Sequence, residues 1–329
     1  MTARAYWVEA AGRGAIRDAV VGEPGDGEVR VRTLFTGISR GTESLVFQGK
    51  VPPNQAEAMR CPNQEGDFSF PIKYGYIAVG VVESGCDLEG QAVFCLHPHQ
   101  THFVVPRAAV TVLPAGLDPA LAVLCANMET AVNGVWDADP SREDTVTVIG
   151  AGVVGALVAW RLQQQIDTPV QLVDTQPRRA ELAAALGVEF ATPAAASPER
   201  SLIVHCSGSE RGLQQALTLA AADGKIVEMS WFGDRQVSLA LGEHFHSRRL
   251  TLQSSQVGSI PPRMRAEWSY ERRMQLVLEL LTDHPELSVL IDAESMFADL
   301  PNTMSVLAQS AGGVLCHRVR YKEDTRCID

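Results

Sequence analysis

Apolar and polar positions follow two different patterns along this chain, and the change between them lies near residue 120. Before it, short runs rich in β-branched residues are separated by Gly, Pro and Asp, which predicts strands joined by turns. The predicted strands cover residues 28–35, 77–83, 91–94 and 102–106. Residues 1–120 are therefore expected to form a β-rich or barrel-like domain.

Apolar positions take on helical spacing after Pro119, where residues 121–135 predict a helix. From about Thr145 strands and helices alternate, which is typical of a parallel sheet covered by helices. Strands are predicted at 146–149, 171–174, 201–206 and 224–229, and helices at 156–162, 178–186 and 212–221. The fold class is therefore α/β, with a doubly wound parallel (Rossmann) sheet in a domain of residues 121–262.

The last part, residues 263–329, combines a helical pattern at 264–281 with a predicted strand at 314–321. We expect this part to return to the first domain.

Three glycines follow the first predicted strand of the α/β region: Gly150, Gly152 and Gly155. In a dinucleotide-binding turn, the first glycine permits the turn, the second lets the backbone approach a pyrophosphate, and the third lets helix and strand pack closely. The unpaired N–H groups of the helix start, including Val153 and Val154, then face the phosphates. The motif predicts a dinucleotide site.

An acidic residue supports this interpretation, because Asp174 ends the next predicted strand about 20 residues further on. Its carboxylate is placed to accept hydrogen bonds from the adenosine ribose and would repel a 2′-phosphate. We therefore expect NAD(H) to be favoured over NADP(H). Arg178 lies just downstream and offsets part of this repulsion.

The composition excludes several classes of binding partner. With 329 residues the chain has room for two domains of about 150 residues each. Its net charge of −11 argues against nucleic acid and against an acidic membrane surface, which both attract basic proteins. No apolar run approaches the roughly 18 residues that span a bilayer, and the N-terminus lacks a signal-peptide core. The seven scattered cysteines suggest reduced thiols, which are typical of the cytoplasm, so we expect a cytoplasmic protein. The partner that we expect is a small-molecule substrate.

Motifs at four places resemble the medium-chain dehydrogenase/reductase superfamily, the zinc-type alcohol dehydrogenase-like proteins, over nearly the whole chain. They are residues 37–43, residues 73–80, the glycine motif and residues 205–209. Segments 36–44, 64–67 and 73–76 are most similar to the bacteriochlorophyllide a dehydrogenase group. That group oxidises a hydroxyethyl substituent of a tetrapyrrole and also has relatives of unassigned function. The resemblance implies a GroES-like first domain and a Rossmann domain.

The resemblance also bears on metal binding. Zinc-dependent members hold the catalytic ion with side chains at positions that match Ser39, Tyr76 and Ala126 here. A hydroxyl, a phenol and a methyl group do not replace thiolate, imidazole or carboxylate ligands. The four-Cys structural zinc lobe is missing as well, so we expect no zinc.

The segment that contains Cys95, His97, His99 and His102 leaves a second metal hypothesis open. In an extended strand, the first three would share one face. The alternative is that these histidines hydrogen-bond locally or face solvent. His99 is also a candidate proton carrier, because imidazole titrates near neutrality.

Without a metal, hydrogen-bond donors must stabilise the charge that develops on a substrate oxygen during hydride transfer. Tyr76 and Ser39 match positions beside that oxygen and are the leading candidates, Tyr76 as acid/base or donor and Ser39 as second donor. Tyr76 alternatively fills the vacated metal cavity. Glu43, Glu129 and Asn127 are further candidates, for proton relay or tuning of Tyr76. The alternative for Glu129 is a turn cap or an ion pair with Lys73.

The resemblance places further residues beside the cofactor. Arg40 is expected at the pyrophosphate, where its guanidinium suits two phosphate oxygens. The residues expected near the nicotinamide are Thr130, Ser207, Gly208, Ser255 and Gln256. An edge strand at residues 248–254 is the predicted contact of a homodimer.

These observations predict a zinc-independent NAD(H) oxidoreductase that acts on a secondary alcohol/ketone pair. Two alternatives stay open: a metal-free enoyl or quinone C=C reductase, and a dinucleotide-binding sensor without turnover. Asp174 weighs against the first, since such reductases prefer NADPH. The missing metal ligands keep the second open.

Overall fold

Two units make up the chain in the computed structural model, which describes residues 1–309 and 313–322. Unit 1 comprises Met1–Ala126 and Leu278–Asp329, and unit 2 comprises Asn127–Val277. The boundaries predicted from the sequence, after residues 120 and 262, fall 6 and 15 residues before those of the structure, which follow Ala126 and Val277. Both long helices at the boundaries, α2 (Cys125–Ala138) and α6 (Tyr270–Asp283), contain a boundary within them.

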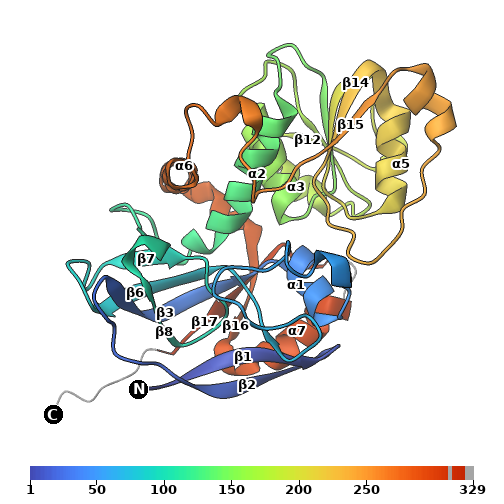
Figure 1. Ribbon diagram of the computed structural model, residues 1–329. Coiled ribbons are helices and arrows are strands. Elements are labelled where there is room, and N and C mark those ends of the chain that lie inside the picture. Colours follow the sequence, from blue (N-terminus) through green and yellow to red (C-terminus); the bar gives the residue numbers. More distant parts are fainter. Residues whose placement is uncertain (310–312, 323–329) are drawn as a thin grey trace. The chain divides into compact units, whose positions relative to one another are not determined.

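Unit 1 is built on two sheets (Figure 1). The smaller has the order β2-β1-β5-β4, from β1 (Thr2–Ala10), β2 (Arg13–Val20), β4 (Glu65–Gly66) and β5 (Ile72–Lys73). The larger has the order β16-β17-β3-β6-β7-β9, and β8 also pairs with β3. Its strands are β3 (Glu28–Ile38), β6 (Ala78–Ser84), β7 (Ala92–Cys95), β8 (His102–Pro106), β9 (Val110–Val112), β16 (Ile291–Met296) and β17 (Cys316–Arg320).

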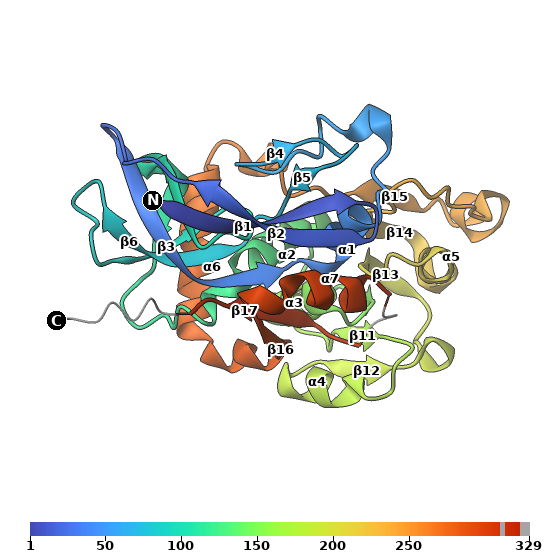
Figure 2. The ribbon, with the colours of Figure 1, turned by 90° about the horizontal axis from the view of Figure 1, so that it is seen from below.

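Alternation places one face of β3 in the core of the larger sheet, where Val29 and Val31 pack with Val82 and Phe103. The late strand β17 pairs antiparallel with β3, with His317 opposite Ile38. Two helices, α1 (Arg40–Phe47) and α7 (Leu300–Gln309), pack on each other, and α7 packs on β2 (Figure 2). The last part of the chain thus completes the sheet that the first part begins.

Unit 2 contains a six-stranded parallel sheet in the order β12-β11-β10-β13-β14-β15. The strands are β10 (Val146–Ile149), β11 (Gln171–Val173), β12 (Glu189–Ala191), β13 (Arg200–His205), β14 (Ala220–Glu228) and β15 (Thr251–Ser254). Helices α3 (Val153–Gln163), α4 (Arg179–Ala185) and α5 (Glu210–Leu219) connect them (Figure 1). This is the predicted doubly wound sheet, and its order reverses between β10 and β13, where such sheets bind ligands.

The structure differs from the prediction at one element that was missed and at two that were predicted. The hairpin of β1 and β2 was not predicted, because β2 is half-buried to exposed along its length and carries only a weak alternation. The helix expected from residue 264 starts at Tyr270, because Ser269 caps it by accepting the N–H of Arg272 at 3.1 Å. Ala220, expected in a helix, begins β14 and pairs with Arg200.

Six cysteines lie in the described residues and are free thiols: Cys61, Cys86, Cys95, Cys125, Cys206 and Cys316. The seventh, Cys327, lies outside the described residues. None of the helices found in residues 1–309 and 313–322 combines the length and apolarity that a membrane crossing requires.

Candidate active site

The start of α1 in unit 1 brings together two of the predicted catalytic residues. Ser39 precedes the helix and Glu43 lies in its first turn. The Glu43 carboxylate is 3% exposed, and its Oε1 accepts the backbone N–H of Ser39 at 2.7 Å. A carboxylate at this place also compensates the positive end of the helix.

The second carboxylate oxygen of Glu43 lies within hydrogen-bond distance of His99. Its Nε2 lies 2.9 Å from Glu43 Oε2, and its Nδ1 lies 2.7 Å from Thr36 Oγ1. The Thr36 hydroxyl in turn lies 3.3 Å from that of Tyr321. The result is a buried chain of polar groups from four separate segments of unit 1, so His99 is held in place rather than exposed to solvent.

Tyr76 lies beside the side chains of Ser39 and Thr42. Burial, followed by the charge of Glu43, raises the pKa of the Tyr76 phenol well above its usual range, and these two side chains lower it by less. The ring remains partly exposed and lies edge-on to Tyr74, with centroids 6.1 Å apart. Tyr76 is therefore a protonated phenol at neutral pH, able to donate a hydrogen bond.

Cys61 is a neighbour that the sequence did not single out. Burial raises the pKa of its thiol to about 12; a backbone hydrogen bond with Gly75 lowers it and the charge of Glu43 raises it. Cys61 is thus a neutral thiol close to the Tyr76 and Glu43 group. A single cysteine without a partner motif gives no sequence signal for such a place.

The three positions matched to zinc ligands carry Ser39, Tyr76 and Ala126, as the sequence has them. Within residues 1–309 and 313–322, no group of three or more His, Cys, Asp or Glu side chains is arranged to hold a metal ion. The three matched side chains offer a hydroxyl, a phenol and a methyl group, which fit zinc poorly.

The histidine segment is not the extended strand that was expected. Strand β7 ends at Cys95, and residues 96–101 form a turn and a single bridge. The His97 ring stacks on Phe103, with centroids 3.8 Å apart, and burial lowers its pKa to about 3. His102 lies 3.8 Å from Glu83, so the imidazoles point to separate partners. All three are buried, so they do not face solvent. Local hydrogen bonding, the other part of that alternative, is confirmed for His97, whose Nδ1 lies 2.8 Å from Pro98 O.

The glycine motif of unit 2 gives each glycine a different environment. Gly150 has φ of +107°, and a Cβ there would lie 2.7 Å from the backbone of Ser207. A Cβ on Gly152 would meet nothing within 4 Å, whereas one on Gly155 would lie 1.9 Å from the carbonyl oxygen of Gly150. The space above the turn is therefore open at the second glycine and closed at the third, while Val153 and Val154 begin α3.

Asp174 directly follows β11 and is bound to this turn. Its Oδ2 accepts the N–H of Ala151 at 2.8 Å, and its Oδ1 accepts the N–H of Gln176 at 2.9 Å. The Gln176 amide oxygen accepts from Arg178 at 2.8 Å. Each carboxylate oxygen keeps lone pairs for further donors, such as ribose hydroxyls.

The other predicted cofactor residues divide between the units. Ser207 and Gly208 follow β13, and Ser255 and Gln256 follow β15, at the carboxyl edge of the same sheet. Thr130 lies half-buried on α2 in unit 2. Arg40 is the first residue of α1 in unit 1.

Glu129 has a partner that the sequence did not predict. Arg273 donates to its Oε1 from Nε at 3.1 Å and from Nη2 at 3.0 Å, and also donates to Val257 O at 2.9 Å. Lys73, the expected partner, pairs with Glu65 instead. Burial raises the pKa of Glu129, and Arg273 lowers it by less. The neighbouring Asn127 is buried, and its Oδ1 has no hydrogen-bond partner in the described part of the chain.

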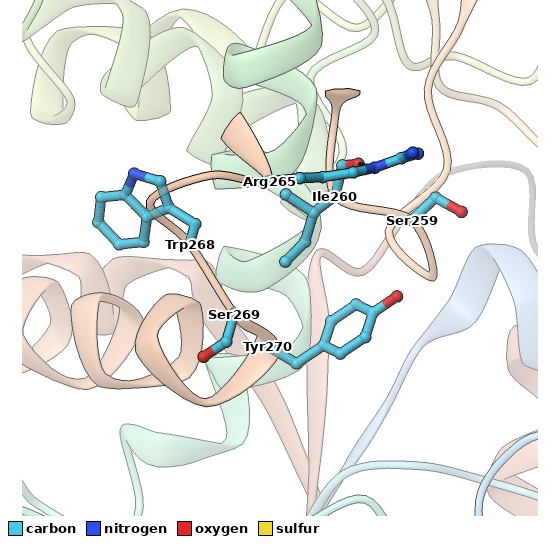
Figure 3. A pocket seen from close by; sticks show the side chains of 6 residues that line it. All are labelled: Ser259, Ile260, Arg265, Trp268, Ser269 and Tyr270. Carbon is cyan, nitrogen blue, oxygen red and sulfur yellow. Dashed lines mark hydrogen bonds between the residues drawn. The ribbon is translucent and has the colours of Figure 1, made fainter. Parts of the chain in front are cut away.

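A pocket of about 320 Å³ lies in unit 2, between the end of the loop after β15 and the start of α6 (Figure 3). It is lined by Ser259, Ile260, Arg265, Trp268, Ser269 and Tyr270. Tyr270 is 55% exposed and donates to Gly258 O at 2.8 Å. The sequence analysis did not identify this surface, because its residues gather around an irregular loop.

No model of a known protein family matches the chain. Among curated proteins, the chain is similar to D-guloside 3-dehydrogenase from Escherichia coli K12. The two are 24% identical over 307 residues, which cover 84% of this chain and 87% of the relative.

Two solved structures have the same fold. One is a protein from Sinorhizobium meliloti 1021, designated a zinc-binding dehydrogenase, with bound NADP; it is 18% identical, with a TM-score of 0.78, over 97% of this chain and 99% of that one. The other is an alcohol dehydrogenase from Escherichia coli CFT073 in complex with NADH. It is 18% identical, with a TM-score of 0.76, over the same shares of both chains.

Proposed function

We propose that this chain, which has the fold of the zinc-type medium-chain alcohol dehydrogenases, is an NAD(H)-dependent dehydrogenase that works without zinc. The observation that carries the proposal is the set of side chains at the three positions matched to zinc ligands, Ser39, Tyr76 and Ala126, which offer a hydroxyl, a protonated phenol and a methyl group. The substrate class is a secondary alcohol and its ketone. Because the curated relative is named for a guloside, we propose a sugar or polyol hydroxyl rather than a tetrapyrrole side chain.

The dinucleotide would accept or supply the hydride, and residues of this chain would hydrogen-bond to the substrate oxygen and transfer its proton. In ketone reduction, Tyr76 donates a hydrogen bond and then its proton to the carbonyl oxygen as charge develops there, and Ser39 is a second donor. Alcohol oxidation runs in the reverse order: Tyr76 first loses its proton to solvent, and the phenolate then accepts the hydroxyl proton of the substrate as the hydride leaves. Glu43 and His99 act as positioning residues, because both are almost fully buried and lie within hydrogen-bond distance of each other.

Open space at Gly152 and the helix N-terminus behind it suit a pyrophosphate, and we propose that they hold it. Asp174 would accept the adenosine ribose hydroxyls. A C=C reductase is the less favoured alternative, because Asp174 opposes the 2′-phosphate of NADPH. We also propose a cytoplasmic homodimer, with β15 as the contact, since this strand ends the sheet and exposes Leu252.

Titration with both coenzymes tests the nucleotide assignment. We expect NADH to bind at least tenfold more tightly than NADPH, because the Asp174 carboxylate would lie against the extra phosphate. Asp174→Ser should reduce or reverse this ratio, while Glu181→Ser, an acidic residue on α4, should leave it unchanged. Fluorescence of the bound reduced nicotinamide gives both affinities. Tighter NADPH binding by the unaltered protein would contradict the proposal.

Replacing Tyr76 with phenylalanine tests the chemistry. We expect Tyr76→Phe to lower kcat about 100-fold, since loss of one oxyanion donor typically has that effect, with little change in NADH affinity. Initial rates on a ketose panel with NADH measure it. Protein dialysed against a chelator is the control and should keep its activity with less than stoichiometric zinc. A Tyr76→Phe enzyme as fast as the parent would remove the phenol from the mechanism, and stoichiometric zinc would refute the metal-free proposal.

A further inference from the structure

Three polar residues at the carboxyl edge of the unit 2 sheet form a continuous hydrogen-bonded line. His205, the last residue of β13, is fully buried. Its Nδ1 lies 2.6 Å from Oε2 of Glu228, the last residue of β14, and its Nε2 lies 2.6 Å from Ser207 Oγ. Glu228 is mostly buried, whereas Ser207 is exposed. The line therefore runs from the interior of the sheet to its surface.

Glu228 fixes which nitrogen of His205 carries the proton. The other carboxylate oxygen, Oε1, accepts the N–H of Ser230 at 2.6 Å, so the carboxylate is an acceptor on both sides. Nδ1 of His205 must then donate to Glu228, and in the neutral ring Nε2 is left as an acceptor. The ring is held in place by Phe232, stacked at 6.4 Å.

The polarity of Ser207 follows from this tautomer. Its only hydrogen is donated inward to His205 Nε2, and its oxygen also accepts the N–H of Ser209 at 3.2 Å. One lone pair remains for the exposed side. Ser207 thus presents an acceptor, not a donor, to whatever binds there.

The position of Ser207 connects it with the glycine turn. A Cβ on Gly150 would lie 2.7 Å from the N and Cα atoms of Ser207, so the two backbones touch at the point where the sheet order reverses. A ligand above the turn would meet the Ser207 oxygen.

We propose that Glu228 and His205 are positioning residues that make Ser207 a hydrogen-bond acceptor for the nicotinamide riboside half of the coenzyme. The inference rests on the proposed function for the ligand, but the tautomer itself does not. The donor that Ser207 recognises is the carboxamide N–H or a hydroxyl of the adjoining ribose, two groups that analogues separate.

Nitrogen NMR of protein labelled at histidine tests the tautomer without any ligand. His205 should appear as the neutral ring protonated at Nδ1, and Glu228→Met should move the proton to Nε2. The matched control is the exposed pair of His284 and Glu286, 2.8 Å apart, where Glu286→Met should leave the signals of His205 unchanged. A His205 ring protonated at Nε2 in the parent protein would overturn the proposal.

Binding of coenzyme analogues tests the acceptor. Ser207→Ala should weaken NADH binding about tenfold, the size of one hydrogen bond, whereas Ser254→Ala, at the end of β15, should not. If Ser207 accepts a hydrogen bond from the carboxamide N–H, Ser207→Ala should not weaken binding of reduced 3-acetylpyridine adenine dinucleotide, which lacks that N–H. If Ser207 accepts a hydrogen bond from a ribose hydroxyl, Ser207→Ala should not weaken binding of an analogue that lacks that hydroxyl on the nicotinamide ribose. Equal loss with NADH and all analogues, or no loss with any, would overturn the assignment. Failure of the parent protein to bind NADH would instead refute the proposed function, and the NMR result would still stand.

Discussion

Gly155→Ala is expected to lower the free energy of unfolding by about 3 kcal/mol or more and to abolish dinucleotide binding. The added Cβ would lie 1.9 Å from the carbonyl oxygen of Gly150 and 3.2 Å from the Cβ of Cys206. The first of these is a backbone atom and cannot rotate away, so α3 must move off the sheet. Urea denaturation followed by circular dichroism measures the loss, and NADH fluorescence measures binding.

Gly152→Ala is the matched control, because it adds the same methyl group at another glycine of the motif, where the surroundings are open. Nothing lies within 4 Å of that Cβ, and the residue has φ of −77°, which alanine adopts freely. Stability should fall by less than about 1 kcal/mol, the effect of a changed helix N-cap. NADH should bind more weakly if a pyrophosphate approaches there. A Gly155→Ala protein as stable as Gly152→Ala would show that the packing argument is wrong.

Arg273→Met is expected to reduce stability by about 4 kcal/mol, because it leaves the carboxylate of Glu129 buried without its charged partner. Both side chains are almost fully inaccessible. The double variant Glu129→Leu/Arg273→Met should recover most of the loss, since it removes both charges from the interior. Urea denaturation of the parent, both single variants and the double variant completes the cycle. A double variant no more stable than Arg273→Met would contradict this interpretation.

The pH dependence of the same variant has a defined sign. Burial raises the pKa of Glu129 above its ordinary value of 4.5, and Arg273 opposes the rise. Without Arg273 the pKa should rise further. A carboxyl group with a raised pKa in the folded state favours folding below its unfolded pKa and loses that contribution as pH rises through its folded pKa. The defect of Arg273→Met should therefore be smaller at about pH 5 than at about pH 8.

What could be predicted from the sequence was local. The turn at Gly150, Gly152 and Gly155 and the acid at Asp174 follow from spacing, since each acts within one strand–turn–helix unit. Tyr76 and Ser39 were expected together from the family resemblance, and the structure places their side chains beside each other.

The partners of buried charges could not be predicted. Arg273 and Glu129 are 144 residues apart, and His99 and Glu43 are 56 apart. Such pairs depend on how helices and loops meet after folding, and a charged residue in a helical pattern looks the same whether it faces water or a partner. The histidine segment failed for a related reason, because alternation of residue types does not show that a strand has already ended.

The place of β17 in the larger sheet bears on the order in which the chain matures during synthesis. This strand lies between β16 and β3, so the sheet that begins near residue 28 stays open until residues 316–320 have left the ribosome. Unit 2 is continuous from Asn127 to Val277 and is available in full much sooner. The nascent chain can therefore complete unit 2 first, while unit 1, which carries Tyr76, waits with an unpaired strand edge.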